Sequence, residues 1–230
     1  SMARTRRGLF LRLFRLLLWT ILGWIVLSGG LVLALRWIDP PTSAFMLREE
    51  GRVRHRWVAW NEISPHAKVA VIAAEDQRFP DHRGFDLDSI NQALADIERG
   101  RRVRGASTIS QQVAKNLFLW PGQSWVRKGL EAYFTVLIEL LWSKPRILEV
   151  YLNIAEFGRG VYGVGAASEV FFRTSPARLD AAQAALLAAV LPSPKRMRAD
   201  APSPYVRSRQ EWIMNQMRAL GGTSLLQRIE

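Results

Sequence analysis

A run of twenty residues without a charge, from Leu16 to Leu35, constrains this chain more than any other feature. At about 1.5 Å of rise per residue, a helix of this length crosses the roughly 30 Å hydrocarbon core of a bilayer. Five arginines precede the run, and such positive flanks stay on the cytoplasmic side of a membrane. We therefore predict a cytoplasmic basic tail over 1–15, a transmembrane helix over 16–36, and everything beyond it outside the cytoplasm.

A cleaved signal peptide is an alternative interpretation of the same run. The small residues Ser28, Gly29 and Gly30 offer a cleavage site. However, the run exceeds the ~7–15 apolar residues of a signal-peptide core, which favours a retained anchor. A buried core helix is disfavoured because its flanking arginines would need partners.

Composition bounds what can follow the anchor. The chain has 230 residues, 49% of them hydrophobic and 23% charged, so one globular domain fits and a second catalytic domain does not. Cysteine is absent, which excludes a disulfide framework and a cysteine-rich zinc site. The formal charge is +12, and the first 36 residues contribute six arginines and no acid. The remaining positive charge suits a domain that meets anionic lipid or phosphate.

Helical periodicity and capping signals predict a mainly α-helical domain over 61–230, after a juxtamembrane linker over 37–60. Ser124 and Pro145 suit helix starts, and Gly221 suits a helix end. No alternating pattern predicts a sheet, although the linker has room for one extended piece. The predicted helices span residues 66–76, 87–99, 108–119, 124–142, 144–155, 161–172, 180–190 and 204–219.

The first polar motif begins with Glu75 and Asp76, directly after the apolar stretch 69–74. This stretch places the Glu75 carboxylate at the end of a buried helix, where it is partly desolvated. Desolvation would raise its pKa and favour a proton acceptor near neutral pH, whereas Arg78 or Lys115 would lower the pKa. Taken alone, the two acids would more often form a salt bridge with Arg78 or cap a helix.

The second motif lies on the predicted helix 108–119. Thr108, Gln112 and Lys115 share one face of this helix, because they are four and seven residues apart. Ser107 or Thr108 at the helix start would present free backbone N–H groups and the positive end of the helix dipole to a phosphate. As an isolated pattern, this is an ordinary capped surface helix.

The third motif places Arg127 and Lys128 close to Glu131 on one helix. As an isolated pattern, Arg127 and Glu131 form a surface ion pair worth only about 0.3–0.5 kcal/mol. A guanidinium also suits phosphate, because its planar fork holds two oxygens at once.

Together these motifs resemble those of the peptidoglycan glycosyltransferases, which polymerise a lipid-linked cell-wall precursor. The resemblance covers about residues 60–200, and its only noted departure is phenylalanine at position 171, where the family often has tyrosine. The matching motifs, in family order, begin at Glu75, Gly105, Arg127, Lys144 and Gly158.

The resemblance implies a lysozyme-like, two-lobed helical domain after one N-terminal transmembrane helix. It implies inverting transfer that polymerises lipid II into β-1,4-linked glycan and releases undecaprenyl pyrophosphate. Glu75 is implied as the general base, and Glu131 as a second carboxylate that acts at the leaving group or positions the cations. His82 is expected in a supporting role. The residues implied to bind substrate are Asp76, Phe79, His82, Ser107, Thr108, Gln111, Gln112, Lys115, Asn116, Arg127 and Lys128.

No cofactor is implied as required, and the question of Mg²⁺ or Mn²⁺ on the substrate pyrophosphate stays open. The implied partners are lipid II, the growing glycan chain and membrane lipids; proteins of cell division or elongation are an open possibility, and nucleic acid is not expected. The chain has no Ser-x-x-Lys or Lys-Thr-Gly motif, so no transpeptidase activity is expected. It thus resembles the monofunctional enzymes, held by a single span in the bacterial inner membrane with the catalytic domain outside the cytoplasm.

Two other functions remain open at this point. A lysozyme-like lytic glycosidase would also use a glutamate in a helical fold, but it gives no reason for the cation cluster. A membrane-tethered module that binds cell wall or anionic lipid would depend on the +12 charge alone.

Three segments also have two interpretations each. Residues 52–56 form a solvated face or meet anionic headgroups, residues 117–120 with Trp125 meet the bilayer or the core, and the tail 203–230 packs on the domain or on a partner.

Overall fold

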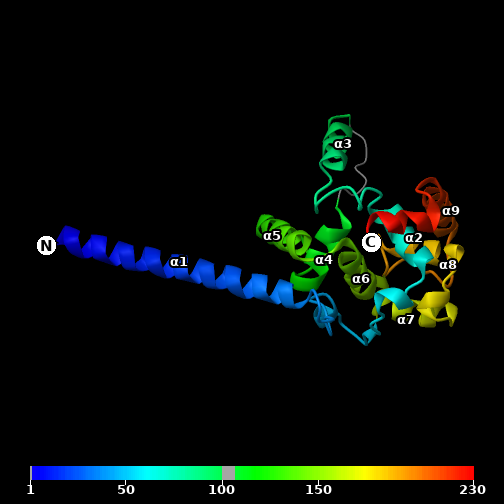
Figure 1. Ribbon diagram of the computed structural model, residues 1–230, viewed down its shortest axis with the longest axis horizontal. Helices are drawn as coiled ribbons and strands as arrows, with labels where there is room; N and C mark the ends of the chain where they lie inside the picture. The colour runs from blue at the N-terminus through cyan, green and yellow to red at the C-terminus, as the bar shows by residue number, and fades with distance from the viewer. Residues whose placement is uncertain (1, 100–106) are drawn as a thin grey trace. The chain divides into compact units, whose positions relative to one another are not determined.

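The computed structural model describes residues 2–99 and 107–230 and divides the chain into two compact units, with the boundary after Ile38. The first unit contains α1 (Met2–Ala34), drawn as one continuous helix in Figure 1. Its stretch Phe10–Ala34 is long and apolar enough to cross a membrane, with a hydropathy of 2.2. This stretch contains most of the predicted span 16–36.

The second unit is mainly helical, as predicted. Every predicted helix is present, with bounds that differ from the prediction by at most two residues. Ser124 caps the helix after it, and Pro145 lies in the first turn of the next. The helices are α2 (Pro65–Glu75), α3 (Leu87–Glu98), α4 (Ile109–Phe118), α5 (Trp125–Leu141), α6 (Lys144–Ile154), α7 (Gly163–Phe172), α8 (Ala181–Val190) and α9 (Pro204–Ala219), with short 3-10 helices η1 (Met46–Arg48), η2 (Trp60–Glu62), η3 (Pro176–Arg178) and η4 (Gly222–Arg228).

A small three-stranded sheet, which the sequence did not predict, joins the linker to the domain. Its strands are β1 (Arg54–His55), β2 (Glu156–Gly158) and β3 (Val161–Tyr162), in the order β1-β3-β2. β1 pairs parallel with β3, and β2 pairs antiparallel with it. Strands of two or three residues are too short to produce a recognisable alternation of apolar and polar residues, which is why the prediction was wrong here.

Two groups of packed helices surround the residues of interest. In one group, α2 packs against α8, α9 and η4 (Figure 1). In the other, α4 packs against α5 and α6. Nearly the whole of α2 is buried, from Ala67 to Ala73, so this helix forms the core from which Glu75 emerges. Burial of such apolar side chains is the main term that stabilises these groups.

The tail 203–230 packs on the domain itself. The helix α9 buries Val206, Ile213 and Met217, and the Gln210 side chain donates a hydrogen bond of 2.8 Å to the Ala182 carbonyl. This answers the question that the sequence left open about the tail.

Two side chains of α6 hold the linker in place. The Asn153 amide accepts a hydrogen bond from the Val58 N–H at 2.8 Å and donates to the Val58 carbonyl at 2.9 Å. The Glu149 carboxylate accepts a hydrogen bond from the Trp60 N–H at 2.7 Å. The linker is therefore ordered against the domain up to the start of α2.

Substitution of Gly163 by alanine is expected to destabilise the protein by about 2–4 kcal/mol. Gly163 has φ +80°, which favours glycine, and an added Cβ would lie 2.6 Å from the Asn153 carbonyl oxygen. Thermal unfolding would then shift down by roughly 5–15 °C. Gly129→Ala is the matched control: it lies within α5, nothing lies within 4 Å of the added Cβ, and a small stabilisation is expected. Equal melting temperatures for the two variants would contradict this account.

Candidate active site

Glu75 is the last residue of α2, and the start of this helix fixes its position. Ser64 caps the helix: its hydroxyl accepts a hydrogen bond from the His66 N–H at 3.2 Å and donates to the Leu179 carbonyl at 2.6 Å. Pro65 occupies the first turn, where its missing N–H costs nothing. A capped, buried helix therefore holds the Glu75 carboxylate at the edge of the core.

Three polar groups surround the Glu75 carboxylate. The Gln112 amide donates a hydrogen bond of 2.9 Å to Oε2, and the Tyr151 hydroxyl donates one of 3.2 Å to the Gln112 carbonyl oxygen. Nη2 of Arg209 lies 3.8 Å from Oε1. Burial raises the pKa of Glu75, and the Gln112 hydrogen bond and the charges of Arg209 and Lys115 offset only part of this effect. The net effect is a raised pKa, a direction that the sequence alone left undecided.

Arg78 does not pair with Glu75. Its Nη1 lies 3.1 Å from Asp86 Oδ1, and it also pairs with Asp88, so it joins the start of α3 to the first motif. The alternative in which Glu75 serves as a structural partner of Arg78 is therefore excluded.

Asp76 and His82 form a buried scaffold beside the carboxylate. His82 Nε2 lies 2.9 Å from Asp76 Oδ1, while His82 Nδ1 accepts a hydrogen bond from the Gly84 N–H at 3.1 Å. Because Nδ1 accepts, Nε2 carries the proton and donates it to Asp76. Asp76 Oδ2 also accepts a hydrogen bond from the Ile109 N–H at 2.9 Å. Asp76 therefore connects the first motif to the start of α4.

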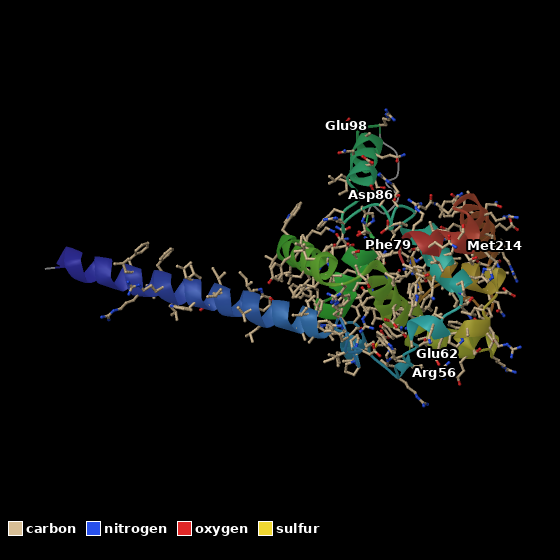
Figure 2. All side chains as sticks on the ribbon, in the orientation of Figure 1. Arg56, Glu62, Phe79, Asp86, Glu98 and Met214 are labelled. Atoms are coloured by element: carbon tan, nitrogen blue, oxygen red, sulfur yellow. The ribbon has the colours of Figure 1, made fainter. Side chains whose placement is uncertain are left out.

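Phe79 is fully buried and lies within the body of the domain (Figure 2). The Lys144 ammonium lies 4.5 Å from the centre of its ring and also pairs with Glu139 at 2.8 Å. The assignment of Phe79, Asp76 and His82 to substrate binding stays a prediction, while the contacts described here give all three a positioning role.

The start of α4 differs from the expected phosphate site. Thr108 and Gln111 form a capping box, in which each side chain bonds the other residue's backbone N–H. The Thr108 hydroxyl also donates to the Gly84 carbonyl at 2.6 Å. With the Ile109 N–H bonded to Asp76, these N–H groups are satisfied within the domain, and a carboxylate occupies the place expected for an anion. The expectation of a free phosphate site was wrong for these three N–H groups, while the role of Ser107 in substrate binding stays a prediction.

A cluster of cations lies on α4 and α5. Glu131 is buried, with Oε2 at 3.0 Å from Arg127 Nη1 and Oε1 paired with Lys128 Nζ. Burial lowers the pKa of Lys115, and the charge of Glu131 raises it in part. Arg127 Nε is buried and has no hydrogen-bond partner among the described residues. An unsatisfied buried donor is costly, which favours a ligand that accepts from it.

These groups line three neighbouring cavities. The cation cluster lines a cavity of about 550 Å³. A second cavity, of about 330 Å³, is lined by Glu75 and shares Ser107 with the first. A third, of about 220 Å³, shares Gln112 and Lys115 and is also lined by Asn116. The predicted site residues that line these cavities are Glu75, Asp76, Ser107, Thr108, Gln111, Gln112, Lys115, Asn116, Arg127, Lys128 and Glu131.

Two residues that were not predicted as site residues also belong to the site. The hydroxyl of Tyr151, a buried residue of the motif that begins at Lys144, reaches Gln112, and Arg209 comes from α9, beyond every motif. The spacing of charges along α9 does not distinguish Arg209 from its neighbour Arg207, so no signal in the sequence identified it.

A helical domain with a desolvated carboxylate beside a cation-lined cavity is suited to an enzyme that acts on an anionic substrate. A family model described as Transglycosylase matches residues 43–218. The chain is 54% identical to a biosynthetic peptidoglycan transglycosylase of Stutzerimonas stutzeri, over 97% of this chain and 95% of the relative. It is 57% identical to one of Klebsiella oxytoca, over 92% of both chains, and 54% identical to one of Cronobacter sakazakii, over 98% of both.

This chain belongs to the transglycosylase family. The predictions of a mainly helical domain behind an N-terminal apolar helix, and of a peptidoglycan glycosyltransferase, are thereby confirmed.

Proposed function

We propose that the protein polymerises lipid II into β-1,4-linked glycan strands and releases undecaprenyl pyrophosphate. The observation that carries this proposal is the position of Glu75, whose desolvated carboxylate lies among cavities that also contain Lys115, Arg127 and Lys128. A proton acceptor beside a cluster of cations suits a reaction that deprotonates a hydroxyl and expels a pyrophosphate.

In the proposed step, Glu75 accepts the proton of the acceptor 4-hydroxyl as that oxygen attacks the anomeric carbon of the donor. The new carbon–oxygen bond forms as the bond to the pyrophosphate breaks, and the leaving group departs with the electron pair. Attack opposite the leaving group inverts the anomeric centre. The raised pKa of Glu75 favours this role, because a general base works best when its pKa lies near the operating pH.

The leaving pyrophosphate is stabilised by Lys115, Arg127 and Lys128. Cations fixed in advance in a water-poor cavity stabilise developing charge more than mobile ones in water do. Both oxygens of Glu131 are occupied by Arg127 and Lys128, so Glu131 positions these cations and does not transfer a proton. This choice between the two roles of Glu131 is part of the proposal.

Any Mg²⁺ or Mn²⁺ in the reaction is proposed to arrive on the substrate pyrophosphate. Within the described ranges, the acidic and histidine side chains form no group of three that could hold a metal ion. The phosphate oxygens of the substrate are suitable hard ligands for either ion, and Mg²⁺ commonly binds to proteins in this way.

The enzyme is proposed to be held in the bacterial cytoplasmic membrane by α1, with its N-terminus inside and its catalytic domain outside. Exposed apolar side chains of α5, including Trp125 at 93% exposure, Val126 and Leu140, are proposed to meet lipid. In the segment 117–120, Leu117 and Leu119 are buried, so only part of it is available for this contact.

The test is incubation of the full-length protein in detergent with labelled lipid II, with and without moenomycin, followed by gel separation of the products. A ladder of glycan that moenomycin suppresses is the expected result. Unchanged lipid II with cleavage of preformed glycan would show a lytic enzyme instead, and no change in either substrate would leave only a binding module.

Removal of Arg209 is expected to move the acid limb of the activity profile to higher pH. The charge of Arg209 lowers the raised pKa of Glu75 in part, so Arg209→Met should raise it further. The base is active only when ionised, so activity at about pH 6, relative to about pH 8, should fall several-fold. Arg207→Met, two residues away and exposed, is the matched control and should keep the wild-type profile. Identical profiles for both variants would contradict this role of Arg209.

A further inference from the structure

A groove lined by basic side chains lies beside the catalytic cavities. It is a cavity of about 490 Å³ on the sheet side of the domain, and we refer to it as the basic groove. One carboxylate, that of Asp200, lines it. The cationic residues that line it are Arg52, Arg54, Arg159, Lys195 and Arg198.

Only two of these cations are paired. Lys195 Nζ lies 2.6 Å from Glu49 Oε2, and Arg198 holds Asp200 through two hydrogen bonds of 3.1 and 2.8 Å. The other three arginines are exposed and have no carboxylate partner within the part of the chain that the structure describes. Arg159 is attracted by the charges of Glu49 and Glu156 without pairing with either. The groove still has an excess of positive charge, and each of these arginines can donate hydrogen bonds to a carboxylate.

The backbone fixes these three arginines close together. The Arg54 N–H donates a hydrogen bond of 2.8 Å to the Gly160 carbonyl, which places β1 beside the turn that contains Arg159. Gly160 has φ +68°, and a Cβ there would lie 2.7 Å from the Arg52 carbonyl oxygen. The close approach of these two backbone segments thus depends on a glycine and does not depend on the arginine side chains.

The basic groove borders the cavities of the candidate active site. It shares Pro194 with the cavity of about 220 Å³, which in turn shares Lys115 and Gln112 with the main catalytic cavity. At the junction, Lys195 also lies 3.8 Å from Glu156, a residue of that middle cavity. A polymer that extends from the catalytic residues through the middle cavity would reach Arg159 and Arg54 next.

We propose that the basic groove binds the peptide carboxylates of the glycan strand while the strand is still held at the active site. This proposal rests on the proposed polymerising function. The sugar backbone of peptidoglycan is uncharged, and its peptides present carboxylates at regular intervals. Exposed arginines bind each carboxylate weakly, and several weak contacts along one strand retain it while allowing it to advance. The groove would thereby increase the number of additions before release.

The test compares two double variants of the full-length protein, Arg54→Ala/Arg159→Ala in the groove and Arg173→Ala/Arg178→Ala as a control. The control removes the same charge from a separate surface pocket. Each protein is given lipid II, or lipid II whose peptide carboxylates are amidated, and strand lengths are measured on gels. We expect the groove variant to make strands roughly two- to fivefold shorter, because exposed ion pairs contribute only weakly. Wild type on the amidated substrate should be similarly shortened, and the control should match wild type.

The assay is also repeated with the proteins in vesicles of increasing anionic lipid content. Three results would overturn the proposal: unchanged strand lengths in the groove variant, equal shortening on both substrates, or a loss that follows the anionic lipid content of these vesicles. The last result would assign the groove to lipid headgroups. Binding of labelled, peptide-bearing glycan strands, measured by fluorescence anisotropy, separates this proposal from the proposed function. Weaker binding by the groove variant alone would support the groove even if no protein polymerised lipid II, and equal binding by all three proteins would contradict it.

Discussion

Replacing Glu75 with glutamine is expected to abolish glycan polymerisation while the protein stays folded. Glutamine has nearly the same shape and can still accept the hydrogen bond from Gln112, which lies 2.9 Å from the carboxylate in the wild type. It cannot accept a proton from the acceptor hydroxyl. Loss of a general base costs about 10²–10⁴ in rate. The measurement is the initial rate of lipid II consumption at saturating substrate.

The stability of the same variant provides a second readout. Because burial raises the pKa of Glu75, the folded protein binds this proton more tightly than the unfolded chain, and the ionised group destabilises the fold above that pKa. Stability from this residue is therefore greatest at low pH and falls as the pH rises through the raised pKa. Glu75→Gln should unfold at the wild-type temperature or above it at neutral pH. Glu169→Gln, exposed on α7, is the matched control for activity. An active Glu75→Gln enzyme would refute the assignment of the base.

Replacing Glu131 with glutamine is expected to reduce both stability and activity. Glu131 is buried and compensates the Arg127 guanidinium, whose side chain is 9% exposed. Leaving a buried charge without its partner costs about 3–5 kcal/mol, which would lower the melting temperature of a chain of this size by roughly 5–20 °C. Activity should fall because Arg127 and Lys128 are no longer held at the cavity.

A double variant separates the structural role of Glu131 from a chemical one. Arg127→Met/Glu131→Leu removes both buried charges, and hydrophobic replacements of such pairs are often neutral or stabilising. We expect this variant to regain most of the lost stability and to remain inactive, because the pyrophosphate loses a cation. A wild-type melting temperature for Glu131→Gln would instead show that the pair does not stabilise the fold, and loss of only the basic limb of its pH profile would identify Glu131 as an acid.

The helices were predictable because their signals are local. Capping residues such as Ser124 and Asp180, and prolines in the first turn, act within a few residues of the position that they mark. The sheet was not predictable in this way, because β1 and β3 are short and are separated by about a hundred residues of chain. Its formation depends on the glycines at the β2–β3 turn and on the Asn153 amide, which act only after the domain has packed.

The same contrast between local signals and contacts of distant segments applies to the candidate site. The motifs place Lys115, Gln112 and Arg127 correctly at the cavity, because helical spacing decides which side chains share a face. Spacing does not reveal which distant segment supplies a partner. For this reason the sequence missed Arg209, and it assigned a phosphate to N–H groups that Asp76 and the capping box already satisfy.

Asp76 accepts two hydrogen bonds, from His82 and from the Ile109 N–H, and so links the residue after Glu75 to the start of α4. Glu75, the proposed proton acceptor, directly precedes this aspartate in the chain, and α4, the helix that carries Lys115, begins at Ile109. In the proposed reaction, the spacing between the proton acceptor and the cation that receives the charge of the leaving group is thus set when the chain folds. Little reorganisation energy then remains to be supplied when the two lipid-linked substrates meet.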